Sequence, residues 1–531
     1  MKNAIVIMFD SLQFNYLGCY GNDWIKTPNM DRLAREGVLF ENCYTENLPT
    51  VPCRRSMHTG RYYFYKSGWC PLTMEDTTIA DLCWGRPIDT ALVFDCPMYR
   101  LPKFGYTRGF DKVYFLHGHA LDHFFYENDT VYHENVMDYF DPVITEKARK
   151  HLGDTTVEFT IQEAKAYLAQ TQYWKGPDDR YVARTVQNAI KYLEQVDRNK
   201  QFFLWIDSFD PHEPWNPPSI YMHEPCPYDP DYDGYPGFMT FLGICDEMYT
   251  ERDLHHIRML YSELVTLCDT QLGKLMDAIR RLGFEEDTLF MMVSDHGEPM
   301  GNGEHGHGIL CKCRPWPYEE LTHTPLIIRG PGLPAGKRVA GFIQSCDVAP
   351  TICDWLGIGV HPSMNGKSLL PMCRGEVEKI RDYAIAGYYK GGIAYITEDW
   401  YYVHWMCDGK DDRIWMEDTN ENMASASAAN MAGGGHGSVL TMHGEDVADI
   451  DELTAHAEAD AEARTQEVYT QDGEAMWTCT PGASFIMHDG DELYKRREDP
   501  FQLNNVIADY PEEAKRLLAE FNAIIEELRL S

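Results

Sequence analysis

The chain has 531 residues and a formal net charge of −36. A negative charge of this size argues against nucleic acid or an anionic membrane as the partner, because both would repel it. No stretch approaches the ~20 consecutive apolar residues of a membrane span, so the sequence predicts no membrane partner.

The cysteine pattern bears on location. Sixteen cysteines stand at irregular spacing without a signal-peptide pattern, which predicts reduced thiols and a cytoplasmic protein. An exported form with disulfide bonds is the alternative. The length of the chain suffices for two or three domains.

The first predicted element is a strand at Asn3–Phe9, an apolar run that ends in Asp10. In open α/β sheets, ligands gather at the carboxyl ends of the strands, so Asp10 is a candidate metal ligand. The alternative is a helix N-cap.

The segment at 47–61 contains Thr50, with a proline on each side of it. Pro49 and Pro52 suit an irregular approach followed by the first turn of a helix. A helix that starts near Pro52 would direct its N-terminal amides and its positive dipole end at Thr50. A threonine hydroxyl is a poor nucleophile until a base, a metal or a dipole favours its alkoxide. The alternative role for Thr50 is to cap a surface helix.

Further along the chain, three apolar runs are predicted strands that end in polar segments with aspartate, and two of these segments also hold a histidine. They are Thr90–Phe94 before Asp95, Phe202–Ile206 before the segment from Asp207 through His212, and Thr288–Val293 before the segment with Asp295 and His296. Apolar spacing also predicts helices at Val182–Gln195, Leu254–Leu282 and Pro511–Leu530.

The segment around Thr50 resembles the signature of the sulfatase family, within the alkaline-phosphatase-like superfamily. That signature runs Cys (or Ser)-x-Pro-Ser-Arg, then four residues, then Thr-Gly-Arg. Thr59-Gly60-Arg61 fixes the register, which places Arg54 on the signature arginine, Cys53 on its serine and Thr50 on the nucleophile. The formylglycine that sulfatases make from cysteine or serine therefore cannot form there.

The resemblance implies a set of metal ligands and a set of residues around the ester. The metal ligands would be Asp10, Thr50, Asp295 and His296, and this oxygen-rich set with one imidazole suits Ca²⁺, Mn²⁺, Mg²⁺ or Zn²⁺. One ion is expected rather than two, because Ser11 replaces the second aspartate of many relatives. Arg54, His212 and Lys312 would face the ester oxygens, and His307 would protonate the leaving group.

The resemblance is nearly continuous over residues 3–375 and implies the fold. It is α/β, with a large, mainly parallel mixed sheet flanked by helices, and a smaller α+β C-terminal domain with a short antiparallel sheet. The expected domains are a catalytic domain at 1–375 and a C-terminal subdomain at 376–531. The C-terminal subdomain has predicted strands at Ala384–Tyr395 and Trp400–Trp405. It also carries an acidic low-complexity insert at about 417–475.

Three functions remain open. The first is a metal-dependent hydrolase of a small-molecule or glycan ester of sulfate, phosphate or phosphonate, with Thr50 as nucleophile. Threonine lacks the second hydroxyl of hydrated formylglycine, so water must resolve the covalent intermediate at the central atom, which favours phosphorus. The second is a phospho-group transferase, and the third is a non-catalytic binding protein with the same fold.

The sequence also leaves open the roles of Asp95 and Tyr99, and whether the chain forms a homo-oligomer.

Overall fold

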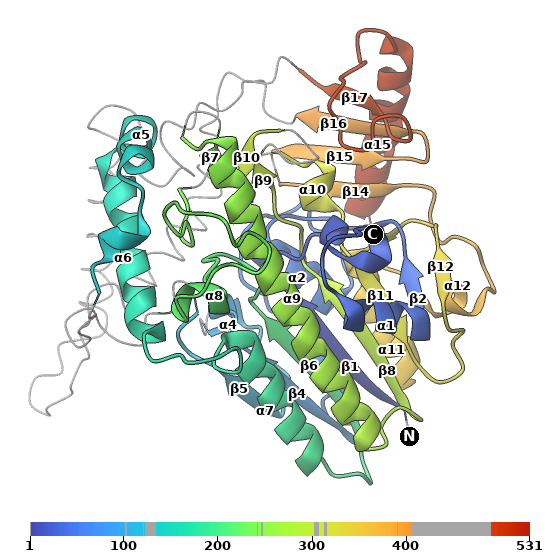
Figure 1. Ribbon diagram of the computed structural model, residues 1–531. Helices are drawn as coiled ribbons and strands as arrows, with labels where there is room; N and C mark the ends of the chain where they lie inside the picture. Colours follow the sequence, from blue (N-terminus) through green and yellow to red (C-terminus); the bar gives the residue numbers. More distant parts are fainter. Residues whose placement is uncertain are drawn as a thin grey trace, which may run out of the picture.

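The computed structural model describes residues 2–100, 104–119, 122, 134–241, 243–245, 248–301, 307–312, 316–389, 391–405 and 490–530. Its centre is an eight-stranded sheet with the order β12-β2-β11-β8-β1-β6-β4-β5 (Figure 1). The strands are β1 (Asn3–Phe9), β2 (Val38–Phe40), β4 (Ile88–Phe94), β5 (Lys112–Phe115), β6 (Gln201–Ser208), β8 (Thr288–Ser294), β11 (Leu326–Arg329) and β12 (Lys337–Val339). Within the described residues, only β11 runs against its neighbours in this sheet. The predicted mainly parallel mixed sheet is confirmed.

The central strand β1 contributes to two hydrophobic clusters, one on each face of the sheet. Ile5, Ile7 and Phe9 enter one cluster, and the alternate residues Val6 and Met8 enter the other. Successive side chains of a strand point to opposite faces, so a strand covered on both sides reads as an unbroken apolar run. Because β1 is buried on both faces, its residues are all apolar except Asn3, and the strand could be predicted from the sequence.

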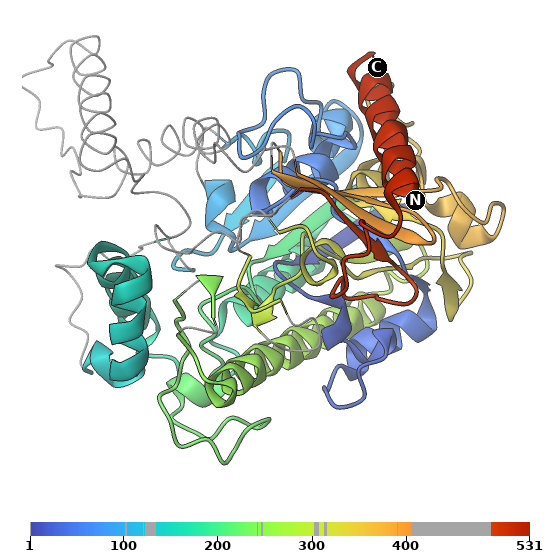
Figure 2. The ribbon, with the colours of Figure 1, turned by 90° about the horizontal axis from the view of Figure 1, so that it is seen from above.

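Helices cover both faces of the sheet. One face packs against α1 (Pro28–Glu36), α7 (Tyr181–Gln195) and α9 (Glu251–Arg281), and the other against α2 (Thr50–Thr59), α3 (Ile79–Cys83) and α11 (Val348–Leu356). Figure 2 shows α9 along one side of the sheet. The predicted helix at Leu254–Leu282 is α9. It begins a few residues earlier than expected because Thr250 and Asp253 form a capping box at its start.

A second, antiparallel sheet lies near the C-terminus and is formed by β14 (Ala384–Gly387), β15 (Gly392–Ile396), β16 (Trp400–Trp405) and β17 (Glu492–Lys495). The helix α15 (Pro511–Leu530) packs Leu517 and Phe521 against it (Figure 1). The predicted helix at Pro511–Leu530 and the short antiparallel sheet are confirmed. The prediction of one strand at Ala384–Tyr395 is wrong, because the chain reverses between β14 and β15. A backbone hydrogen bond from Gly391 N to Tyr388 O closes that turn.

The remaining elements are short, apart from a helical hairpin of α5 (Pro142–Leu152) and α6 (Asp154–Thr171) at the left of Figure 1. The short ones are β3 (Cys43–Tyr44), α4 (Pro97–Arg100), α8 (Pro218–Tyr221), β7 (Gly243–Ile244), β9 (Met300–Gly301), β10 (Ile309–Leu310), α10 (Glu319–Thr322), β13 (Ile343–Gln344) and α12 (Leu370–Arg374). The predicted insert at 417–475 lies outside the described residues, and the domain boundary at 375 stays a prediction.

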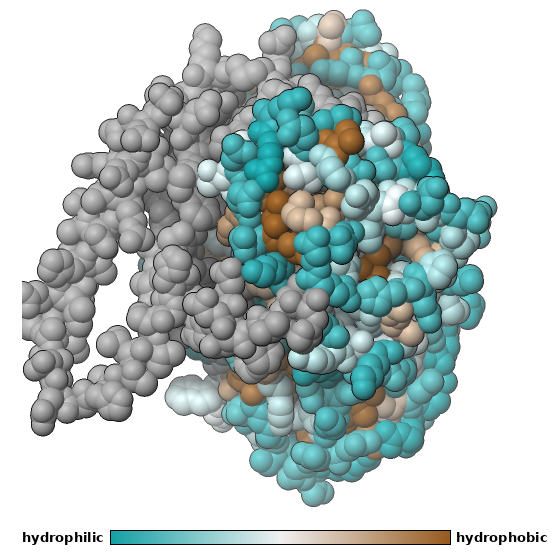
Figure 3. Space-filling view, turned by 60° about the vertical axis from the view of Figure 1, so that its left-hand side comes forward, coloured by the Kyte–Doolittle hydropathy of each residue, from teal (hydrophilic) through white to brown (hydrophobic). Residues whose placement is uncertain are grey.

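The visible face in Figure 3 is mostly hydrophilic, with smaller hydrophobic areas between the polar residues. None of the helices in the described part of the chain combines the length and the apolar character that a membrane span needs.

Candidate active site

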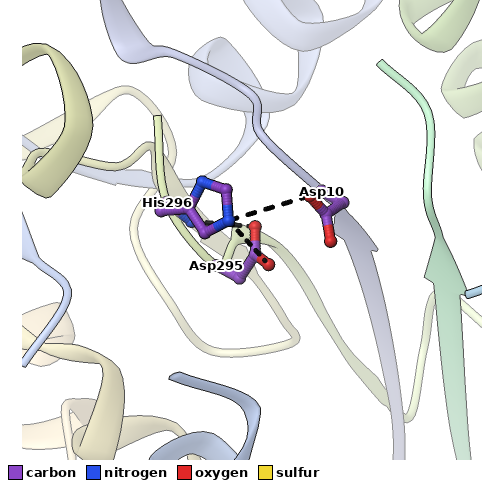
Figure 4. Close-up of side chains that lie close together, drawn as sticks. All are labelled: Asp10, Asp295 and His296. Carbon is purple, nitrogen blue, oxygen red and sulfur yellow. Dashed lines mark hydrogen bonds and ion pairs between the residues drawn. The ribbon is translucent and has the colours of Figure 1, made fainter. Parts of the chain in front are cut away.

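The predicted metal ligands of β1 and β8 meet at one edge of the large sheet. The two strands are parallel neighbours, with Phe9 opposite Ser294, so the residues that follow them also lie side by side. Ser11 N donates a 3.0 Å hydrogen bond to Oδ1 of Asp295. Asp10, Asp295 and His296 each offer a ligand atom, and these atoms all lie within 4.8 Å of one another (Figure 4). The expectation that the three residues converge is confirmed.

His296 presents one nitrogen to the two carboxylates. Its Nδ1 donates to Gly297 O at 2.7 Å, which leaves Nε2 as the lone-pair nitrogen. Nε2 lies 3.9 Å from Asp10 and 3.5 Å from Asp295. Burial lowers the pKa of His296 to about 4, so the ring is neutral at pH 7. Two carboxylates and a neutral imidazole with a free lone pair form a donor set that fits a divalent ion.

Thr50 is the first residue of α2, a helix whose residues are all buried. Its Oγ1 lies 3.2 Å from Nε2 of His296. The helix was predicted to begin near Pro52 and begins two residues earlier, which brings Thr50 itself into the first turn. The positive end of the helix dipole therefore lies at this hydroxyl.

Cys53, which the register places on the serine of the signature, is held by hydrogen bonds within the protein. Its thiol donates to the backbone oxygen of Asp295 at 3.0 Å and lies 3.3 Å from Thr45 Oγ1. Burial raises the pKa of this thiol well above its ordinary value, which makes it a weak nucleophile.

Arg54 lies one turn after Thr50 and is fully buried among three carboxylates. Its Nη1 lies 2.9 Å from Asp10 and 2.5 Å from Asp295. Its Nε and Nη2 donate to Asp207 at 3.1 and 2.8 Å. The sequence assigned Arg54 to the ester oxygens, whereas its contacts in the structure are with these aspartates. Three carboxylates thus face one guanidinium, and a divalent ion would offset the negative charge that remains.

Asp207 was not among the predicted site residues. Like Asp10, it lies at the carboxyl end of a central strand, β6, next to β1, where Met8 stands opposite Asp207. The same strand-end argument that selected Asp10 could have selected Asp207 as well. Its partner Arg54 comes from a distant part of the sequence, and no spacing rule connects the two.

His212 and Lys312, which the resemblance assigned to the ester oxygens, contact each other. Lys312 Nζ is in hydrogen-bond contact with His212 Nε2. Nδ1 of His212 donates to Glu213 O at 2.5 Å, and burial with the Lys312 charge lowers the pKa of His212 well below its ordinary value. Burial alone would lower the pKa of Lys312, but Glu213, Glu298 and Asp10 outweigh it and raise that pKa. The pair is therefore a charged ammonium beside a neutral imidazole.

His307 has a different set of partners. Its Nδ1 lies 3.2 Å from Glu320, its Nε2 lies 3.1 Å from the backbone oxygen of Gln502, and its ring stacks on Tyr318 at 4.0 Å. The Gln502 contact ties His307 to the segment after β17, and none of the three contacts is with Thr50, Asp10, Asp295 or His296. His305, the neighbouring histidine in the sequence, lies outside the described residues.

Asp95 and Tyr99, whose roles the sequence left open, contact residues next to the site. Asp95 accepts hydrogen bonds from Phe209 N at 2.5 Å and Thr185 Oγ1 at 2.8 Å. The Tyr99 ring lies 5.5 Å from the Arg54 guanidinium, and its hydroxyl lies 2.8 Å from His58 Nε2. Tyr99 thus adds a cation–π contact to the buried arginine.

Comparisons with known proteins identify the family and support the fold. A sequence profile of the sulfatase family matches residues 2–358. An arylsulfatase of Clostridium perfringens is 26% identical over 456 residues, which cover 79% of this chain and 86% of that protein. The multifunctional alkaline phosphatase superfamily protein PehA of Trinickia caryophylli is 26% identical over 409 residues, which cover 70% and 76%. The crystal structure of a phosphonate monoester hydrolase of Agrobacterium radiobacter is similar in fold, with a TM-score of 0.62 at 20% identity over 100% of this chain and 96% of that one.

The family match spans well over half of the 531 residues, and the two aspartates and the histidine that the resemblance implied as metal ligands lie close together. The chain belongs to the sulfatase family of ester hydrolases.

Proposed function

We propose that the protein hydrolyses phosphate or phosphonate esters, and more slowly sulfate esters, with Thr50 as nucleophile and one divalent ion in the site. The observation that carries the proposal is the position of Thr50 Oγ1, 3.2 Å from Nε2 of His296 at the N-terminus of α2. The substrate would be a small-molecule or glycan ester. A cytoplasmic location stays a prediction.

A divalent ion held by Asp10, Asp295 and His296 would lower the pKa of the Thr50 hydroxyl and bind an ester oxygen. The helix dipole of α2 stabilises the same alkoxide. Arg54 holds the aspartates in place and offsets part of their charge. This arrangement prepares Thr50 for in-line attack on the central atom of the ester.

The proton for the leaving group is assigned to the Lys312–His212 pair. Lys312 keeps its proton because nearby carboxylates raise its pKa, and it can bind an ester oxygen as charge develops. His212 is neutral, and its Nε2 accepts a hydrogen bond from Lys312, which positions the ammonium. The partners of His307 lie elsewhere, which is why we prefer this pair to His307 as the acid.

A panel of nitrophenyl esters tests the proposal. With metal-loaded protein, kcat/KM should be highest for phosphorus esters and lower for the sulfate, because water attacks a phosphorylated threonine more readily than a sulfated one. Asp10→Asn is the control, and it should be inactive on every ester if the reaction belongs to this site. Absence of turnover on the whole panel would favour a non-catalytic binding protein, and transfer to an added alcohol instead of water would favour a transferase.

Metal content gives a second test. We expect one tightly held divalent ion per chain and loss of turnover on chelation. The described residues contain a second group with potential ligands, Glu213, Glu298 and Cys311, but the Lys312 ammonium already lies against both carboxylates. Binding of one ion should raise the thermal midpoint, since a ligand at 100 times its Kd stabilises the folded state by about 2.7 kcal/mol. Elemental analysis that finds two tightly held ions would contradict the prediction.

A further inference from the structure

The imidazole of His212 has an aromatic neighbour on its face. The Phe209 ring stacks on it with 3.9 Å between the ring centroids and 25° between the ring planes. Hydrogen bonds hold the same imidazole at its two nitrogens, one with Glu213 O and one with Lys312 Nζ. Hydrogen bonds at the edge of a ring restrict its tilt less than a flat contact on its face does. Phe209 therefore fixes the plane of the imidazole that holds Lys312.

The backbone of Phe209 is itself held on both sides. Its amide donates to Oδ1 of Asp95 at 2.5 Å, and its carbonyl oxygen accepts from His212 N at 2.9 Å. Asp95 directly follows β4, the neighbour of β6 in the large sheet, and also accepts from Thr185 Oγ1 at 2.8 Å. The Asp95 side chain is fully buried, so water does not compete for these hydrogen bonds. Asp95 thus sets the position from which the Phe209 ring reaches His212.

The loop that carries Phe209 and His212 has a separate anchor. The buried Arg180 donates through Nε to Oδ1 of Asp210 at 2.9 Å and through Nη1 to the backbone oxygen of Asn216 at 2.6 Å. Both ends of the loop are therefore held without the Phe209 ring. A variant that lacks only this ring should keep the loop in place and change the alignment of the imidazole.

We propose that Phe209 and Asp95 are positioning residues for ester hydrolysis that act through His212. Asp95 fixes the backbone of Phe209, the Phe209 ring aligns the imidazole, and the imidazole directs the Lys312 ammonium at an ester oxygen. The proposal rests on the proposed function and assigns Asp95, at the end of β4, a role in the same site.

A double-variant cycle tests the proposal on the nitrophenyl ester that the wild-type protein hydrolyses fastest. Phe209→Leu should lower kcat by up to about 100-fold and change KM much less, since a misplacement of about 1 Å can cost that much in the transition state. In the His212→Ala background, Phe209→Leu should have no further effect on kcat, because residues that act through one group are not additive. An unchanged kcat for Phe209→Leu, or equal losses in both backgrounds, would overturn the proposal.

Asp95 provides a second pair of variants if Phe209→Leu folds poorly. Asp95→Ala should lower kcat in the same way and should also lose its effect in the His212→Ala background. Asp95→Asn should restore most of the turnover, because its amide oxygen still accepts from Phe209 N. If Asp95→Asn were as inactive as Asp95→Ala, the carboxylate would not act by holding this backbone.

Phe203→Leu is the matched control, because it removes a buried ring from β6, the strand that leads into Phe209. The Phe203 ring stacks on Phe110 at 5.9 Å, among the apolar residues of the sheet. Phe203→Leu should lower the thermal midpoint, yet its folded fraction should keep the kcat of the wild-type protein. A loss of kcat equal to that of Phe209→Leu would mean that both rings act only through folding.

Two outcomes keep the claims apart. Additive losses in the cycle would overturn the positioning role and leave ester hydrolysis intact. A wild-type protein inactive on the whole nitrophenyl panel would overturn the proposed function, and calorimetry of inorganic phosphate binding to the metal-loaded protein would then test the positioning role. Phe209→Leu should weaken phosphate binding in the wild-type background and leave it unchanged in His212→Ala, and equal weakening in both would contradict the proposal.

Discussion

Thr50→Ala should reduce kcat by at least about 1,000-fold, because the remaining groups only position and polarise the ester. The protein should stay folded, since the substitution removes one hydroxyl and one methyl group from the first turn of α2. Thr50→Ser should keep part of the activity, because a hydroxyl remains near His296 Nε2. Single-turnover kinetics and the thermal midpoint of each variant check these expectations.

Cys53→Ser is the matched control for Thr50. It keeps a donor for the backbone oxygen of Asp295 and stands on the same helix, so it should retain most of the turnover. Inactivity of Cys53→Ser together with an active Thr50→Ala would show that the register counted from Thr59-Gly60-Arg61 is wrong. The preference for phosphorus over sulfur would then fall as well.

Arg54→Met should destabilise the protein by about 3–5 kcal/mol and abolish turnover, because it leaves buried carboxylates without their counter-charge. Asp207 would be affected most, since it takes two hydrogen bonds from Arg54 and is not among the grouped metal ligands. The double variant Arg54→Met/Asp207→Asn should therefore recover part of the lost stability but not the turnover. Thermal or urea unfolding with and without divalent ion measures both effects.

The neighbouring Arg55 offers a control with the same chemistry. Its side chain is 4% exposed and pairs with Asp76 at 2.8 Å, away from the carboxylates of the site. Arg55→Met should also lower the thermal midpoint, yet its folded fraction should keep its turnover. Equal loss of turnover in the two variants would mean that Arg54 acts only through folding.

Those parts of the fold that follow from local pattern were predictable. β1 and β8 are unbroken apolar runs of strand length and α15 has a helical apolar period, and the two strands place Asp10 and Asp295 at a shared edge. The turn between β14 and β15 was missed although Gly391-Gly392 follows it, a dipeptide typical of turns, because the apolar residues on both sides were taken as one run.

The electrostatic network of the site was not predictable from the sequence. Lys312 meets Glu213 from about a hundred positions away, and Arg54 meets Asp207 from more than a hundred and fifty. Such pairs are created by tertiary packing, and no local spacing encodes them. The contact of His307 with Gln502, 195 residues away, is another pair that no local spacing encodes. The role of His307 as the catalytic acid stays a prediction.

The pairing of β16 with β17 identifies a connection in this fold that can take inserted residues. Val403 stands opposite Glu492, so two strands that are neighbours in the sheet are joined by a very long connection. The entropy of closing a loop rises by only about 0.6 kcal/mol for each doubling of its length. Because the strands fix their own register through buried residues such as Tyr401 and Leu493, the connection is free to vary in length and content. This junction is therefore the natural place to graft a tag, a reporter or a foreign domain without disturbing catalysis.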